Sequence, residues 1–166
     1  IETRPDWCVS RQRVWGVPLP IFVNKHTKEI LVDNEVIENI ASIYDKEGSD
    51  CWFSDNPQRF LGKKYKAEDY DKLSDIVEVW FDSGSTHSFV LEKRQDLKWP
   101  ASMYLEGSDQ HRGWFHSSLL ESCGTRGRAP FETILSHGFV VDGKGLKMSK
   151  SLGNVISPED ILKKYG

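Results

Sequence analysis

A loop near the end of the sequence carries residue types suited to binding a polyanion. Residues 143–154 read GKGLKMSKSLGN and contain three lysines, three glycines and two serines. Glycine lets a backbone approach a ligand closely, and lysine supplies a compact, mobile positive charge. Lys147 and Lys150 are therefore candidates to stabilise phosphate charge. The alternative for an arbitrary loop of this composition is a solvated, lysine-rich surface loop.

A second group of candidate residues follows segments that read as strands. Each member also has a structural explanation: Asp109 as a helix cap, His137 as a hydrogen-bonded histidine, Trp114 as core. A carboxylate such as Glu106 beside a buried strand implies a partner. In open α/β sheets, ligands bind at the carboxyl ends of strands. The residues expected there are Trp80, Asp82, Glu106, Gly107, Asp109, Gln110, His137 and Gly138.

The elements that would position these residues alternate between strand and helix. Residues 76–81, 102–107 and 133–141 read as strands, and the helix after 109 has an apolar face until Gly124 and Gly127. This order predicts an α/β fold, the second half of a doubly wound parallel sheet. Half a sheet should leave one face or edge uncovered, with Val77, Val79, Met103 and Leu105 in strands. A last helix should begin at Ser157 and Pro158.

The N-terminal part predicts a smaller, separate arrangement. Residues 19–23 read as a strand, 24–32 as a turn into a second strand, and 33–47 as an amphipathic helix capped by Asp33 or Asn34. Residues 49–75 look polar and irregular, anchored by Trp52-Phe53 and Phe60-Leu61. Between residues 4 and 15, arginines alternate with tryptophans, which suits either base stacking or an aromatic core covered by arginines.

Composition excludes several classes of protein. The net charge of −3 over 166 residues gives no global basic field for nucleic acid. No apolar run approaches the ~20 residues of a membrane span. Cys8, Cys51 and Cys123 are far apart, so they predict neither a disulfide framework nor a zinc site, and they suit a reducing cytosol. The start without Met and the end inside a helical pattern suggest a piece of a longer polypeptide.

Specific strings link these features. KMSKS at 147–151 resembles the signature loop of class I aminoacyl-tRNA synthetases. SRQRVWGVPLP (10–20), VWFDSGSTHS (79–88), YLEGSDQHRGWF (104–115) and LSHGFVVDGKGLKMSKS (135–151) resemble the isoleucyl type of bacteria, in family-like order. The resemblance divides the chain into a re-entry segment at 1–23, a small α+β insertion at 24–75, the second half of the catalytic fold at 76–142, and the KMSKS loop with the following helix at 143–166.

The resemblance implies an ATP-dependent ligase that activates isoleucine and transfers it to tRNA(Ile), with Mg²⁺ accompanying ATP. It implies catalytic roles for Lys147 and Lys150. The ATP and adenylate would contact Glu106, Gly107, Asp109, His137, Gly138, Met148 and Ser149. The aminoacyl group would contact Trp80, Gln110 and Trp114.

The resemblance also leaves alternatives. One alternative is a valyl- or leucyl-type synthetase, since those relatives share KMSKS. The other is a non-enzymatic domain that has kept the fold and binds RNA or a partner. Some relatives bind zinc through cysteines at the 24–28 turn, but Asn24, His26 and Thr27 stand there. The other family signature, His-Ile-Gly-His, does not occur in this sequence. We therefore expect this chain to be inactive alone and to act with the remainder of a synthetase, in the cytoplasm.

Overall fold

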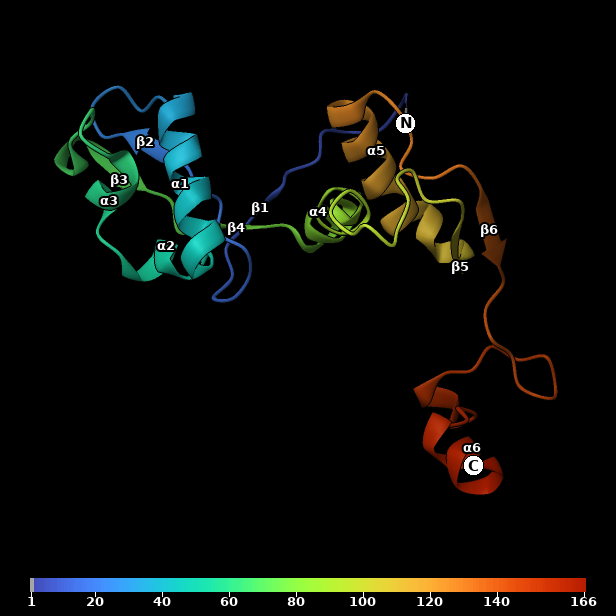
Figure 1. The fold of residues 1–166 in the computed structure, drawn as a ribbon. Helices are drawn as coiled ribbons and strands as arrows, with labels where there is room; N and C mark the ends of the chain where they lie inside the picture. The colour runs from blue at the N-terminus through green and yellow to red at the C-terminus, as the bar shows by residue number, and fades with distance from the viewer. Residues whose placement is uncertain (1) are drawn as a thin grey trace. The chain divides into compact units, whose positions relative to one another are not determined.

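A computed structural model describes residues 2–166 of the chain (Figure 1). The chain divides into two compact units, Ile1–Asp82 and Ser83–Gly166. The predicted division of the chain into segments 1–23, 24–75, 76–142 and 143–166 stays a prediction.

The N-terminal unit has its own small core. Strand β2 (Phe22–Asn24) pairs antiparallel with β3 (Tyr70–Lys72), and helices α1 (Asn34–Glu47), α2 (Cys51–Ser54) and α3 (Pro57–Leu61) pack around them (Figure 1). A short 3₁₀ helix, η1 (Ala67–Asp69), leads into β3. Trp52 is central, with its ring centroid 5.1 Å from that of Phe22 and 5.0 Å from that of Phe60. This aromatic cluster holds the unit together.

Helix α1 confirms the prediction for residues 33–47. The Asp33 carboxylate caps the helix by accepting a hydrogen bond of 2.9 Å from the Glu35 amide, and Gly48 ends it. Val36, Ile40 and Ile43 are the buried face. The neighbouring predictions need correction. The strand predicted at 19–23 begins only at Phe22, and Ile30 makes an isolated bridge to Val23 rather than a second strand.

Residues 49–75 are more regular than their polarity predicted. They contain α2, α3, η1 and β3, because the buried Trp52, Phe60 and Leu61 give short helices a core to pack against. Those three anchors are confirmed. Phe53 is not an anchor, since 46% of it is exposed.

Asp33 should make the first helix sensitive to acid. Its hydrogen bonds from Lys64 and Tyr65 lower its pKa from 3.8 to about 2. A depressed carboxyl pKa stabilises the fold above the unfolded pKa, and that contribution disappears as the pH falls toward 2. Asparagine also caps helices but carries no charge. Amide hydrogen exchange of α1 should therefore show wild type better protected than Asp33→Asn at pH 5, with the difference vanishing near pH 2. An unchanged difference across that range would contradict the assignment.

The strand predicted at 76–81 is cut short. Strand β4 (Ile76–Val77) pairs antiparallel with β1 (Ser10–Arg11), and helix α4 (Val79–Gly84) follows directly. The carboxylate of Glu78 accepts a 3.0 Å hydrogen bond from the Trp80 amide, so it satisfies a free donor at the start of this helix. Val79 is therefore helical, contrary to prediction, because this cap outweighs the β-branched pattern.

The C-terminal unit contains a parallel strand–helix–strand unit. Strand β5 (Tyr104–Gly107) pairs parallel with β6 (Ile134–His137), and helix α5 (Trp114–Arg126) connects them through the 3₁₀ helix η3 (Ser108–Arg112). A π-helix, η2 (His87–Leu91), precedes β5. The α/β class is confirmed, while its identity as the second half of a doubly wound parallel sheet stays a prediction.

Details of the predicted helix after 109 are corrected. Gly113 stands at its N-cap instead of Asp109, since η3 intervenes. Gly124 lies within the helix, and Gly127, with a left-handed φ of 71°, ends it. Phe115, Ser118 and Ser122 are buried.

The predicted uncovered sheet face is confirmed on β5 and β6. Leu105 and Leu135 lie opposite each other in register, and they are 54% and 49% exposed. Met103 lies just before β5 and not in it. Two exposed leucines side by side mark a surface that another layer can cover.

After β6 the chain forms the lysine-rich loop, a 3₁₀ helix η4 (Lys150–Leu152), and helix α6 (Pro158–Tyr165). Ser157 caps α6 as predicted, accepting a 3.2 Å hydrogen bond from the Glu159 amide. Within residues 2–166, no helix has the length and apolar character needed to cross a membrane.

Candidate functional site

The parallel pairing of β5 and β6 brings the predicted strand-end residues together. In register, Glu106 faces Ser136 and Gly107 faces His137. A methyl group on Gly107 would come within 2.5 Å of Asp109 Oδ1 and 3.7 Å of His137 Cε1. Asp109 and His137 therefore lie beside Gly107, which is buried, and the Asp109 side chain would have to shift if Gly107 carried a methyl group.

Glu106, near the end of β5, is more exposed than its place beside a buried strand predicted. Glu106 is exposed, and no hydrogen bond or ion pair to its carboxylate is found within residues 2–166. Burial therefore does not demand a partner for Glu106 inside the chain. His137 Nδ1 lies 2.8 Å from the carbonyl oxygen of Gly138, which orients the imidazole beside the strand end.

Hydrogen bonds connect three further predicted residues in series. Gln110 Nε2 donates to Asp109 Oδ2 at 3.2 Å, and Gln110 Oε1 accepts from the Trp114 amide at 2.9 Å. The indole of Trp114 stacks on Tyr104 at 4.1 Å between centroids and donates from Nε1 to the Ser83 carbonyl at 2.9 Å. Two contacts therefore fix Trp114: stacking holds its ring, and the hydrogen bond sets the orientation of the indole.

Trp80 belongs to the other unit. It lies in α4 and is 43% exposed. The structure gathers Glu106, Gly107, Asp109, Gln110, Trp114, His137 and Gly138 in the C-terminal unit, with the lysine-rich loop following the same strand.

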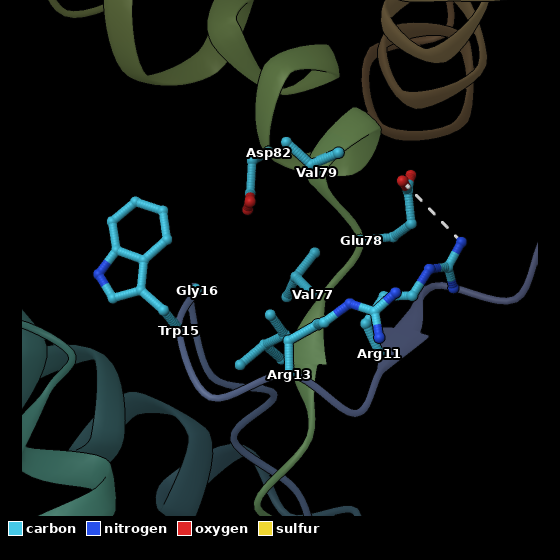
Figure 2. A pocket seen from close by; sticks show the side chains of 9 residues that line it. Arg11, Arg13, Trp15, Gly16, Val77, Glu78, Val79 and Asp82 are labelled. Atoms are coloured by element: carbon cyan, nitrogen blue, oxygen red, sulfur yellow. Dashed lines mark ion pairs between the residues drawn. The ribbon is translucent and has the colours of Figure 1, made fainter.

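A hollow of about 360 Å³ in the N-terminal unit is lined by residues of the segment 11–16, of β4 and of the start of α4 (Figure 2). On one side Arg11 pairs with Glu78 at 3.9 Å, and Glu78 is only 8% exposed. Burial, and then the charge of Glu78, raise the pKa of Asp82. The indole of Trp15, 88% exposed, stands at the other side (Figure 2). Charges of both signs line this hollow, so its field selects neither anions nor cations.

The arginine–tryptophan segment divides between its two interpretations. Trp7 contacts Phe81 at 5.9 Å between centroids, with Arg4 over its ring at 5.5 Å, as expected for aromatics covered by arginine. Trp15 is too exposed for a core residue.

In the loop, the two candidate lysines have different surroundings. The Lys147 ammonium lies 3.5 Å from the centroid of the Phe139 ring, a cation–π contact. Lys150 begins η4 and is exposed, and no partner for its ammonium is found in the described part of the chain. Met148 and Ser149 lie between them, with the Met148 amide donating to the Val140 carbonyl at 3.0 Å. Lys150 is the cation more available to a ligand.

Sequence reasoning missed three residues around this loop. Phe139 contacts Lys147, and Asp142 and Asn154 hydrogen-bond to the loop backbone. An aspartate two residues before a lysine in a glycine-rich turn is a recognisable Asx-turn signal. No comparable local signal marks Phe139 or Asn154, because each acts across several residues.

We expect purified protein to contain no stoichiometric zinc. Across residues 2–166, no group of three or more His, Cys, Asp or Glu side chains is arranged to hold a metal. At the turn where some relatives bind zinc, Asn24 Oδ1 accepts hydrogen bonds from the amides of His26 and Thr27, at 2.8 and 3.0 Å. The turn is thus closed without metal. Elemental analysis measures this directly, and one tightly held zinc per chain from these residues would contradict it.

Comparisons with known proteins identify the family. All of residues 1–166 match the family model described as tRNA synthetases class I (I, L, M and V). The chain belongs to the class I tRNA synthetases.

Among curated relatives, this synthetase chain is 89% identical over 166 residues to an isoleucine–tRNA ligase of Pelagibacter ubique (strain HTCC1062). It is 59% identical over 167 residues to that of Brucella abortus biovar 1 (strain 9-941) and 56% over 171 residues to that of Caldicellulosiruptor saccharolyticus. Each match covers all of this chain but only 18%, 17% and 19% of the relative.

A solved structure supports the fold of this synthetase chain. The crystal structure of the ternary complex of Agrobacterium radiobacter K84 agnB2 LeuRS with tRNA and LeuAMS matches 96% of this chain and 22% of that chain, with a TM-score of 0.65 at 22% identity. At that identity the likeness shows the fold alone.

Proposed function

We propose that this chain is part of an isoleucine–tRNA ligase, which uses ATP to convert isoleucine to isoleucyl-adenylate and then transfers it to tRNA(Ile). The observation that carries the proposal is the convergence of Gly107, Asp109 and His137 at the ends of two parallel strands, followed by the KMSKS loop. The 89% identity to a curated isoleucine–tRNA ligase favours isoleucine over the valine and leucine alternatives. It also disfavours a non-enzymatic binding domain.

Adenosine would lie along the strand ends. Gly107 carries no side chain that would block a ribose, and the carboxylates of Glu106 and Asp109 can accept hydrogen bonds from ribose hydroxyls. His137 and Gly138 would border the adenine with Met148, and Ser149 would approach the phosphates. ATP would arrive with Mg²⁺ as part of the substrate.

The aminoacyl side would use the aromatic residues. Trp114, held by Tyr104 and Ser83, would form one apolar wall of the isoleucine pocket and Trp80 another. Gln110 would face the aminoacyl group. Because Gln110 bonds to both Asp109 and Trp114, it would couple the ribose side of the site to the side-chain pocket.

The chemistry needs positioned charge rather than a protein nucleophile. The isoleucine carboxylate attacks the α-phosphorus, the bond from that phosphorus to the bridging oxygen breaks, and pyrophosphate leaves. Negative charge builds on the leaving group, where Lys150 and Lys147 would stabilise it.

Amino-acid-dependent ATP–pyrophosphate exchange by the full-length protein tests the proposal. Isoleucine should support exchange best. Valine should be weaker by ~10–200-fold, since one methylene is worth ~1–3 kcal/mol, a magnitude already known from isoleucyl-type enzymes themselves. Leucine should give little exchange. Preference for valine or leucine, or no exchange with any of the three, would contradict the proposal.

The rest of the machinery is expected outside this chain. The chain spans less than a fifth of its curated relatives, and it contains no His-Ile-Gly-His segment. We propose that the chain alone is inactive, that the remainder of the synthetase completes the site, and that the whole protein acts on tRNA in the cytoplasm.

A further inference from the structure

Two side chains outside the KMSKS pentapeptide hold the signature loop closed at its base. Asp142 lies before the KMSKS pentapeptide and Asn154 lies after it, twelve residues later in sequence than Asp142. Asn154 Nδ2 donates to Asp142 Oδ2 at 2.9 Å. We refer to Asp142 and Asn154 together as the loop brace.

Asp142 shapes the first half of the loop. Its Oδ1 accepts hydrogen bonds from the amides of Lys144 and Leu146, at 2.8 and 3.0 Å. Backbone bonds join Asp142 and Leu146 at 2.8 Å and Gly145 to Asp142 at 2.9 Å. Gly145 has a φ of 76°, a left-handed conformation that glycine adopts without strain. The Asp142 carboxylate therefore stabilises the turn that precedes Lys147.

Asn154 binds the backbone of the pentapeptide at two residues, Lys147 and Ser149. Its Oδ1 accepts from the Ser149 amide at 2.9 Å, and its Nδ2 also donates to the Lys147 carbonyl at 3.3 Å. The orientation of this amide is determined, because the Ser149 N–H requires an acceptor and the Asp142 carboxylate requires a donor. Ser149 in turn caps η4, where Lys150 lies, by accepting from the Leu152 amide at 3.3 Å.

Amide groups, rather than a lysine of the loop, bind the Asp142 carboxylate. Hydrogen bonds from Asn154, and then from the Leu146 and Lys144 amides, lower the pKa of Asp142. Asp142 thus stays ionised, and no ion pair from it to a lysine is found in residues 2–166. An amide partner, unlike a lysine, satisfies the carboxylate without consuming a cation that phosphate needs.

We propose that Asp142 and Asn154 are positioning residues, which hold the KMSKS backbone in the shape that presents Lys150 to the leaving pyrophosphate. This inference rests on the proposed function. A catalytic group held in place by its own scaffold avoids an ordering cost in the transition state. Without the brace, Lys150 would retain its charge but lose its fixed starting point on η4.

Kinetics of the full-length protein test the role. Asn154→Ala should lower kcat for isoleucine-dependent ATP–pyrophosphate exchange by ~10-fold or more and leave KM for isoleucine unchanged. In a Lys150→Ala background the same change should cost little, because residues that act through one another are not additive. An equal loss in both backgrounds would overturn the role, since Asn154 would then act independently of Lys150.

A charge swap provides the matched control. Asn154→Asp alone places two carboxylates face to face and should be worse than Asn154→Ala. Adding Asp142→Asn restores an amide–carboxylate pair with its polarity reversed, and it should recover much of kcat. Failure of the double variant to improve on Asn154→Asp would count against the pairing.

Amide hydrogen exchange of the full-length protein tests the loop brace independently of enzyme activity. Asn154→Ala should speed exchange of the Ser149 and Leu146 amides by about 10-fold, the scale of one or two net hydrogen bonds. Unchanged exchange would overturn the brace. If the unmodified protein lacks ATP–pyrophosphate exchange activity, the proposed function is overturned and the positioning role with it. The hydrogen bonds of the brace are tested separately by the amide hydrogen exchange result.

Discussion

Replacing Lys150 with alanine in the full-length protein should lower kcat for ATP–pyrophosphate exchange by ~10²-fold or more, the scale of a lost electrostatic stabiliser. The Lys150 ammonium is exposed at the start of η4 and unengaged within residues 2–166, so it is free to meet charge that builds on departing pyrophosphate. An interaction made mainly in the transition state changes kcat more than ground-state affinity. KM for isoleucine should therefore hardly move, as steady-state exchange kinetics will show.

Lys144→Ala is the matched control for this prediction. Lys144 is an exposed lysine of the same loop, and only its backbone contacts Asp142. Its loss should leave kcat nearly unchanged. If Lys144→Ala and Lys150→Ala cost the same, the loop would act only as a general positive surface. If Lys150→Ala raised KM for isoleucine and spared kcat, Lys150 would be a binding or structural residue.

Trp114→Ala should damage isoleucine recognition more than ATP use. The indole of Trp114 is fixed by stacking on Tyr104 and by its hydrogen bond to Ser83, so it offers a rigid apolar wall. Full burial of an isoleucine side chain is worth ~1.5–3 kcal/mol, so loss of one wall of its pocket should raise KM for isoleucine by up to ~150-fold. Exchange kinetics with varied isoleucine and varied ATP measure the two effects separately.

Trp114→Phe separates the wall from the hydrogen bond. Phenylalanine keeps an aromatic face against Tyr104 but cannot donate to the Ser83 carbonyl. KM for isoleucine should rise much less than in Trp114→Ala. Equal losses in the two variants would show that orientation through Ser83, rather than apolar area, determines recognition. A rise in KM for ATP alone would place Trp114 on the nucleotide side and contradict its assignment.

The sequence predicted elements best where local chemistry and packing agree. Helix α1 has both an N-cap at Asp33 and an apolar face, and its bounds were predicted almost to the residue. Residues 76–81 show the opposite case. Their β-branched and aromatic composition predicts a strand, but the buried carboxylate of Glu78 starts a helix at Val79. Composition does not reveal what a single side chain will cap.

The candidate site was predictable only as a set of residues. The strand-end residues from Glu106 to His137 were found from the order of strands and polar residues, and the parallel register of β5 and β6 explains why they converge. Their hydrogen-bond connections were not predictable. The hydrogen bond from Trp114 to Ser83 spans 31 residues, and the one from Asn154 to Asp142 spans 12. Both depend on how the fold brings distant parts of the chain together.

The crystal structure of the full-length protein with a non-hydrolysable isoleucyl-adenylate analogue tests the central claim most directly. That claim is that the carboxyl ends of β5 and β6 are the adenylate site. We predict the ribose of the analogue against the backbone of Gly107 within hydrogen-bond distance of Asp109, and the adenine beside His137. An analogue bound elsewhere, with Gly107, Asp109 and His137 all out of contact with it, would contradict the claim.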